Sequence, residues 1–179
     1  MADDTTPLRL GIVGIEGRMG REIAAAAERD PEVIIIGGTV RPGRVDVPSR
    51  ALAGVTIHES LAALLPLIDV VIDFSTPASS VETARQAAQA GVPAVIGTTG
   101  LTSEQMALLR AASHRIPLWY ARNMSTGIGA LLRCLPEIAR ALEGYDIELI
   151  EAHHRHKVDA PSGTALALAE AILAGLAGE

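Results

Sequence analysis

The densest group of reactive side chains lies near the end of the chain, in the stretch Glu151-Ala152-His153-His154-Arg155-His156-Lys157. Three of the five histidines fall within it. The following stretch, Asp159-Ala160-Pro161-Ser162-Gly163-Thr164, has a proline and a glycine that suit the start of a helix. Cations beside free helix amides are suited to binding carboxylates, and a histidine and a lysine there can donate a proton. The segment predicts a site for an anionic substrate.

Two other interpretations of this cluster stay open. His154 and His156 could share one face of a strand and begin a metal site, although no third ligand is evident in the sequence. The cluster could also be a stretch of solvated surface charge. The anionic-substrate interpretation is favoured, and no metal is expected.

A second chemical signal lies near the start of the chain, where Gly14-Ile15-Glu16-Gly17-Arg18-Met19-Gly20 follows an apolar segment. Glycines at this spacing permit a tight turn and a close approach of the backbone to a pyrophosphate. The helix that follows adds unpaired amides and the positive end of its dipole. A turn without a ligand is the weaker alternative, so the segment predicts a dinucleotide site.

The cofactor preference depends on the end of the next expected strand, which reads Gly37-Gly38-Thr39-Val40-Arg41. A carboxylate at this place usually binds the ribose hydroxyls of NAD, and none is present, whereas Arg41 can hold the 2′-phosphate of NADP. We therefore expect NADPH to be preferred, with NADH as the other candidate. If Arg41 is only a solvated cation, the chain would use either cofactor.

Strands and helices that alternate along the chain must position the glycine-rich turn and the histidine-rich segment. Apolar and β-branched runs predict strands, and capping residues and glycines delimit the helices between them. The pattern predicts an α/β fold: a Rossmann-type parallel sheet with helices on both faces over residues 1–123, followed by the start of a second α+β substrate domain over residues 124–179. The expected strands are Leu8–Val13, Val33–Ile36, Val55–Ile57, Asp69–Phe74, Pro93–Ile96, Pro117–Ala121 and Ile147–Glu151. The expected helices are Arg18–Arg29, Ser60–Leu65, Ala78–Ala90, Ser103–Ala112 (capped by Ser103), Gly127–Leu142 and Ser162–Ala177, and residues 41–50 are expected to form a loop.

Composition narrows the function classes. The formal net charge of −6 argues against a general nucleic-acid or anionic-membrane binder. Aromatic residues make up only 2%, so the core must be aliphatic, and the single cysteine, Cys134, is expected to be a buried thiol. The chain shows neither a signal-peptide pattern nor an apolar run long enough to span a membrane. We expect a cytoplasmic protein.

Five motifs together resemble the 4-hydroxy-tetrahydrodipicolinate reductase (dihydrodipicolinate reductase) family. They are GRMGRE at 17–22, DFSTP at 73–77, VIGTTG at 95–100, ARNMSTG at 121–127 and EAHHRHKVDAPSGTA at 151–165, and the last is very specific. The resemblance runs from about Leu8 to the end of the chain. It implies hydride transfer from NAD(P)H to a cyclic imine dicarboxylate of the lysine and diaminopimelate pathway.

The resemblance also implies roles for individual residues. The catalytic proton donors would be His153 and Lys157. Substrate carboxylates would contact His154, Ser162, Gly163 and Thr164. The cofactor would contact Gly14, Gly17, Arg18, Met19, Arg41, Gly97, Thr98, Thr99, Ala121, Arg122, Asn123 and Met124.

Two departures from the family pattern bear on function. Val40 stands where many members have an acidic residue, which favours NADPH. Members usually continue for a further stretch that completes the second domain and builds a homotetramer, so this shorter chain leaves both the tetramer and full activity open. The alternative function is a truncated, non-catalytic NAD(P)-binding module.

Overall fold

The structure is a computed structural model that describes residues 6–41, 55–153, 155 and 160–178. The chain divides into two compact units, Met1–Tyr120 and Ala121–Glu179. We call them the sheet unit and the helical unit and describe each by itself. Most of the loop expected at 41–50 lies outside the described residues.

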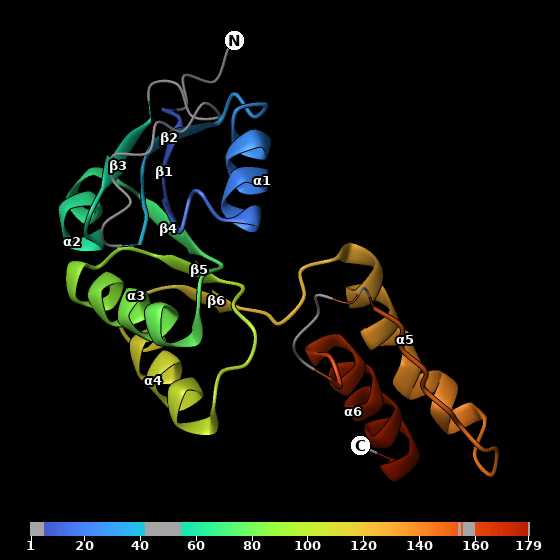
Figure 1. Cartoon of the computed structure of the whole chain (residues 1–179). Helices are drawn as coiled ribbons and strands as arrows, with labels where there is room; N and C mark the ends of the chain where they lie inside the picture. Colours follow the sequence, from blue (N-terminus) through green and yellow to red (C-terminus); the bar gives the residue numbers. More distant parts are fainter. Residues whose placement is uncertain (1–5, 42–54, 154, 156–159, 179) are drawn as a thin grey trace. The chain divides into compact units, whose positions relative to one another are not determined.

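The sheet unit is built on six parallel strands in the order β3-β2-β1-β4-β5-β6 (Figure 1). The chain leaves β1 toward one edge through β2 and β3, then returns beside β1 with β4 and continues to the other edge. Open sheets of this kind bind ligands where the strand order reverses, here between β1 and β4. The expected Rossmann-type sheet is confirmed, with strands at Leu8–Val13 (β1), Val33–Thr39 (β2), Thr56–His58 (β3), Val70–Asp73 (β4), Ala94–Ile96 (β5) and Leu118–Tyr120 (β6).

Helices cover both faces of this sheet, as Figure 1 shows. Side chains alternate between the faces of a strand, so Leu10 and Ile12 of β1 pack with α1, whereas Val13 belongs to the cluster under α2, α3 and α4. Every buried hydrophobic residue among those described is Ala, Val, Leu or Ile, as expected for an aliphatic core. The helices are Arg18–Ala27 (α1), Leu61–Leu64 (α2), Leu65–Leu67 (η1, a 3₁₀ turn), Pro77–Ala90 (α3) and Ser103–Ser113 (α4).

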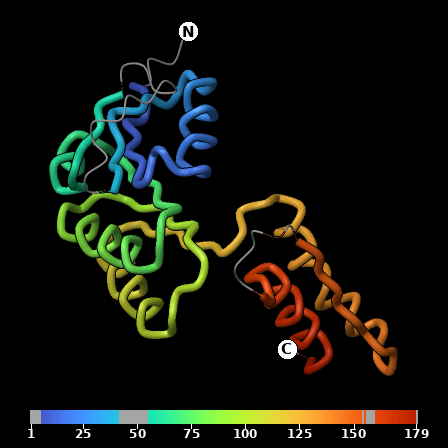
Figure 2. Tube along the Cα trace, viewed as in Figure 1, coloured from blue at the N-terminus to red at the C-terminus, as the bar shows by residue number. Residues whose placement is uncertain are grey.

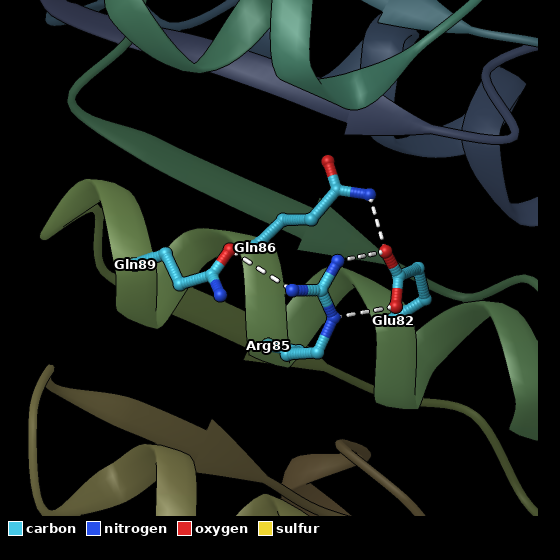
Figure 3. A network of polar contacts seen from close by, with 4 residues as sticks. All are labelled: Glu82, Arg85, Gln86 and Gln89. Atoms are coloured by element: carbon cyan, nitrogen blue, oxygen red, sulfur yellow. Dashed lines mark hydrogen bonds and ion pairs between the residues drawn. The ribbon is translucent and has the colours of Figure 1, made fainter.

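Helix α3 follows β4 and has well-defined ends. Thr76 caps it by accepting from the Ser79 amide at 3.4 Å, Pro77 occupies the first turn, and Gly91 ends it at a φ of 73°. On its exposed side the Arg85 guanidinium donates to both oxygens of Glu82 and to Gln89, and Gln86 also donates to Glu82 (Figure 3). Chiefly because of the hydrogen bonds from Arg85, the pKa of Glu82 is lowered to about 2.

The amino ends of β1 and β4 are joined by a second charged pair. The Arg9 amide and guanidinium all donate to the Asp69 carboxylate, with the shortest contact at 2.7 Å between Nη2 and Oδ1. These hydrogen bonds lower the pKa of Asp69 and raise that of Arg9. Both side chains are more than a third exposed, so the pair aligns the strands but adds little stability.

The edge beyond β5 is formed by β6 and α4. Thr102 caps α4, because its hydroxyl accepts from the Gln105 amide and the Gln105 side chain accepts from the Thr102 amide. The prediction that Ser103 is the cap is therefore wrong by one residue.

On β6 the single tryptophan, Trp119, is 68% exposed.

The helical unit consists of two long helices that lie side by side, α5 (Thr126–Ala141) and α6 (Gly163–Ala177) (Figure 2). They pack tightly at Gly175, where an added Cβ would lie 2.3 Å from the carbonyl oxygen of Pro136. A glycine is needed at this point because no larger residue fits against the backbone of α5. None of the helices in the described part of the chain is long and apolar enough to cross a membrane.

Two expectations for the helical unit are wrong. Residues 147–151 form no strand, because a strand requires a hydrogen-bonded neighbour and none of the described residues pairs with them; Ile147 and Leu149 stay about 40% exposed. Cys134 is exposed rather than buried, because α5 packs against α6 along only part of its surface and Cys134 lies outside that part.

Candidate functional site

The turn after β1 is shaped by glycines. Gly14 has a φ of 70°, a conformation that favours glycine, and its carbonyl oxygen accepts from the Gly17 amide at 2.8 Å. The amides of Gly14 and Ile15 both donate to the Thr39 carbonyl at the end of β2. An added Cβ on Gly20 would lie 2.4 Å from the Gly14 carbonyl oxygen, so the start of α1 lies directly against this turn.

The N-terminus of α1 is open to an anion. Gly17 is the N-cap and therefore provides no side-chain cap, and the first turn contains no acidic residue. The first amides of a helix have no partner within it and carry a partial positive charge. Arg18 and Met19, in this first turn, are both exposed. The residues present fit a diphosphate, which would accept from these amides.

A buried carboxylate organises the segment that follows β4. Asp73 is fully buried at the end of the strand. Its oxygens accept three hydrogen bonds: from the Ser75 amide at 2.7 Å, the Ser75 hydroxyl at 2.5 Å and the Thr83 hydroxyl at 2.6 Å. A buried carboxylate requires such donors, so Asp73 fixes both the turn after β4 and the position of α3.

The segments after β1, β4 and β5 adjoin one another. An added Cβ on Gly14 would lie 3.6 Å from the Cβ of Ser75, and one on Gly97 would overlap the ring of Phe74. The Gly97 amide donates to the Asp73 carbonyl at 2.9 Å, and the Ser80 hydroxyl donates to the buried Thr98 hydroxyl at 2.7 Å. These contacts place the glycine turn and the Gly97-Thr98-Thr99-Gly100 loop on either side of the segment that follows β4, at the carboxyl ends of the strands.

In the helical unit, the side chain of Asn123 joins two segments. Its Nδ2 donates to the Thr164 hydroxyl at 2.8 Å, and its Oδ1 accepts from the Ser125 amide at 2.7 Å. Arg122 lies 3.6 Å from a carboxylate oxygen of Glu170. The structure therefore brings a residue expected at the cofactor, Asn123, into contact with one expected at the substrate, Thr164.

The start of α6 is held by two side chains. The Ser162 hydroxyl caps the helix by accepting from the Ala165 amide at 3.0 Å, and the Ser162 amide donates to Glu151 Oε1 at 2.9 Å. Among the described residues, nothing accepts from the amides of Gly163 and Thr164. The other oxygen of Glu151 lies 3.6 Å from His153 Nδ1. The imidazole of His153 and the N-terminus of α6 are thus connected through one carboxylate.

The expected site residues fall into three groups. Gly14, Gly17, Arg18, Met19, Gly97, Thr98 and Thr99 surround the carboxyl ends of the strands in the sheet unit, and Arg41 is exposed two residues past β2. The helical unit contains Ala121, Arg122, Asn123, Met124, His153, Ser162, Gly163 and Thr164. His154 and Lys157 lie outside the described residues.

No group of three or more metal-binding side chains occurs in the part of the chain that the structure describes. His156, one of the two histidines weighed as a metal ligand, also lies outside that part.

Sequence reasoning missed four residues that support these segments: Asp73, Ser80, Thr83 and Glu151. Asp73 carried a usable signal, because an acidic residue that ends an apolar strand is buried only when donors are near, and Ser75 lies two residues later. The hydroxyls on α3 carried none, since their partners are set by how the helix packs.

Comparison with known proteins places both units in one family. The model described as dihydrodipicolinate reductase, N-terminus, matches residues 8–124, and the model described as dihydrodipicolinate reductase, C-terminus, matches residues 127–179. Relatives named 4-hydroxy-tetrahydrodipicolinate reductase share 47% identity in Thermomicrobium roseum and 45% in Chromohalobacter salexigens, over 93% and 94% of this chain. The chain spans 66% of the length of each of these two relatives.

Solved structures agree with this assignment. The dipicolinate-bound dihydrodipicolinate reductase from Paenisporosarcina sp. TG-14 superposes with a TM-score of 0.76 at 29% identity, covering 93% of this chain and 66% of that one. The WlbA dehydrogenase from Chromobactrium violaceum, in complex with NADH and UDP-GlcNAcA, has a TM-score of 0.59 at 19% identity over 75% of this chain and 41% of its own, a likeness of fold alone. On the two matched family models and the identity to these relatives, the chain belongs to the dihydrodipicolinate reductase family.

Proposed function

We propose that this chain is a 4-hydroxy-tetrahydrodipicolinate reductase, which uses NAD(P)H to reduce a cyclic imine dicarboxylate to tetrahydrodipicolinate in lysine and diaminopimelate biosynthesis. The observation that carries the proposal is the arrangement around Glu151. This carboxylate connects a titratable imidazole, His153, to a helix N-terminus whose amides at Gly163 and Thr164 are available to an anion. A dicarboxylate that must gain a proton needs both groups.

The sheet unit would hold the cofactor. The diphosphate would accept from the amides at the start of α1, beside Gly14 and Gly17, with Arg18 and Met19 around it. Thr98 is buried and its hydroxyl already accepts from Ser80, so we propose that the loop contributes its backbone and the exposed Thr99. Bound NAD(P)H supplies the hydride.

The helical unit would hold the substrate, and the resemblance assigns residues 121–124 to the cofactor. One carboxylate would accept from the amides of Gly163 and Thr164. The Thr164 hydroxyl accepts from Asn123, so its own proton is free to be donated to the same carboxylate. His153 would protonate the ring nitrogen as the hydride adds to the conjugated carbon, with His154 and Lys157 assisting as the resemblance implies. We propose a cytoplasmic location; the homotetramer is what the resemblance implies for the longer family members, and it is left open for this shorter chain.

The test is consumption of NADPH in the presence of freshly generated substrate. We expect turnover by the unaltered chain and a loss of roughly 10²- to 10⁴-fold in kcat for His153→Ala. His114→Ala is the matched control, because His114 is an exposed histidine at the end of α4, and it should retain full activity. Binding of NADPH without turnover by the folded chain would favour the non-catalytic module instead.

We also propose that Arg41 gives the preference for NADPH. It is exposed just past β2, where the ribose end of a dinucleotide lies in this fold. Replacing Arg41 with Ser should raise the Kd for NADPH roughly 10- to 100-fold, the equivalent of a lost charged hydrogen bond, and leave the Kd for NADH unchanged. Arg29→Ser, at an exposed arginine just past α1, should change neither. No change in the Kd of either cofactor would show that Arg41 is only a solvated cation.

A further inference from the structure

Two of the contacts that Glu151 makes are the starting point of the inference. Its Oε1 accepts from the backbone amide of Ser162 at 2.9 Å, and its Oε2 lies 3.6 Å from Nδ1 of His153. The Glu151 side chain is 25% exposed and that of His153 is 40% exposed, so the carboxylate is the more enclosed of the two.

The hydrogen bond to Ser162 determines where the second oxygen points. Ser162 is 4% exposed and is the N-cap of α6, so the atom that anchors Glu151 belongs to a well-packed helix start. With Oε1 held there, Oε2 faces the imidazole ring. A carboxylate oxygen only accepts hydrogen bonds, so a ring nitrogen that faces it is favoured when it carries a proton.

We propose that Glu151 is a positioning residue that holds His153 with a proton on Nδ1 and leaves Nε2 as the atom that exchanges a proton with the substrate. The contact of 3.6 Å is longer than a hydrogen bond, and such contacts commonly shorten when a ligand binds. The catalytic consequence of this role of Glu151 rests on the proposed reductase function. In that reaction the hydride adds to the far carbon of the C=C bond conjugated with the imine, the electron pair moves to the ring nitrogen, and this nitrogen accepts the Nε2 proton, which leaves one double bond in the ring. The imidazole ring is left neutral with its Nδ1 proton, and solvent then returns a proton to Nε2.

The same carboxylate would set the distance between the proton donor and the substrate-binding helix start. Glu151 accepts a hydrogen bond from Ser162, the residue just before Gly163 and Thr164. The amides of Gly163 and Thr164 are proposed to bind the substrate carboxylate. A histidine that lacked this link could rotate about its own side-chain bonds independently of α6. This arrangement follows a general rule: the group that one ring nitrogen faces determines which nitrogen takes part in chemistry.

The experiment measures which nitrogen of His153 carries the proton, by NMR of the ¹⁵N-histidine-labelled chain at a pH where the ring is neutral. His153→Asn identifies the signal by its loss. We expect the unaltered chain to show mainly the Nδ1–H form. In Glu151→Gln the remaining oxygen should stay with the Ser162 amide and the NH₂ group should face Nδ1. Because NH₂ only donates, the population should invert to Nε2–H.

Controls separate this effect from a change in fold. Glu148→Gln, at an exposed carboxylate in the same segment, should leave the His153 population unchanged. Circular dichroism should show the same helix content in both variants, because Glu151→Gln keeps an acceptor for Ser162. A population that is mainly Nε2–H in the unaltered chain, or that does not respond to Glu151→Gln, would overturn the proposal.

Kinetics give the second readout. Glu151→Gln should lower kcat by at least about 10-fold, and by less than the roughly 10⁴-fold that complete loss of acid–base assistance can cost, with KM changed less than kcat. Glu151→Asp should recover part of the loss, because it restores the negative charge. A variant with unchanged kcat would contradict the role of Glu151. If His153→Ala proves fully active, the reductase proposal fails, and the NMR result still decides how Glu151 holds His153.

Discussion

The hydroxyl of Thr83, on the second turn of α3, donates to the carboxylate of Asp73 at the end of β4 across 2.6 Å. Both residues are buried, so water cannot replace this bond if it is lost. We predict that Thr83→Val, which keeps the shape and removes the donor, lowers the free energy of unfolding by about 1–3 kcal/mol. Urea denaturation followed by circular dichroism measures the loss.

The matched control for this substitution is Thr56→Val, at an exposed threonine of the edge strand β3. It should change the free energy of unfolding by no more than about 0.5 kcal/mol. Equal stability of the two variants would show that Asp73 does not depend on Thr83.

Gly20 is predicted to be indispensable to the turn after β1. In Gly20→Ala the new methyl group would meet the backbone of Gly14 and Ile15 at 2.4–2.7 Å, and backbone atoms cannot rotate away as a side chain can. We expect a net loss of at least about 1 kcal/mol in the free energy of unfolding, together with weaker NADPH binding by calorimetry, because α1 must shift from the turn.

Arg21→Ala is the comparison for Gly20→Ala, because Arg21 is the next residue of α1 and is exposed. It should retain both stability and NADPH affinity. If Gly20→Ala binds NADPH as tightly as the unaltered chain does, the close contact between α1 and the glycine turn is not required for the cofactor.

The Glu82–Arg85 pair gives a prediction about pH. The pKa of Glu82 is lowered from 4.5 to about 2 by hydrogen bonds from Arg85 and then from Gln86. Because the pKa of Glu82 is lower in the folded chain than in the unfolded one, the ionised carboxylate stabilises the fold at pH values above 4.5. This stabilisation is lost as the pH falls from 4.5 toward 2. Since both side chains of the pair are about half exposed, we expect Arg85→Met to cost less than about 1 kcal/mol at neutral pH.

The measurement compares Arg85→Met with the unaltered chain by urea denaturation at neutral pH and at about pH 3. The difference should shrink in acid, where Glu82 begins to bind a proton. A difference that stays constant would mean that Arg85 acts by packing its side chain and not by its charge.

Gly175 is predicted to set the distance between α5 and α6. An added Cβ would lie 2.3–2.8 Å from three backbone atoms of Pro136. Gly175→Ala should therefore separate the two helices and lower stability by about 1–3 kcal/mol. Gly129→Ala, in the open part of α5 where nothing lies within 4 Å, should instead stabilise the chain by about 0.5–1 kcal/mol. Thermal unfolding distinguishes the two, and a loss of equal size in both variants would contradict the packing argument.

The sheet unit could be predicted from the sequence because its signals are local. The glycine spacing after Leu8–Val13 and the β-branched run from Val33 depend on neighbours within a few residues, and the structure contains both strands and the turn. The cap of α4 was readable as well: Thr102 has Gln105 three residues later, the spacing of a capping box, whereas Ser103 has Met106.

The errors concern features that depend on distant partners. The apolar alternation at 147–151 is typical of a strand, but a strand also needs a partner strand, and sequence pattern does not supply one. Cys134 lies in an apolar helix, and which side of that helix is covered depends on α6. The roles of Asp73 and Glu151 depend on Thr83 and Ser162, ten and eleven residues away, which only the packing of whole elements brings near.

The exposure of Trp119 at the β6 edge determines what tryptophan fluorescence can report about unfolding or binding. It is the chain's single tryptophan, and its indole already meets solvent in the folded state. Its emission should therefore be red-shifted from the start and should shift little further on denaturation. Intrinsic fluorescence would under-report unfolding of this protein, whereas the same exposed indole is accessible to iodide and can report any partner that comes to cover that edge.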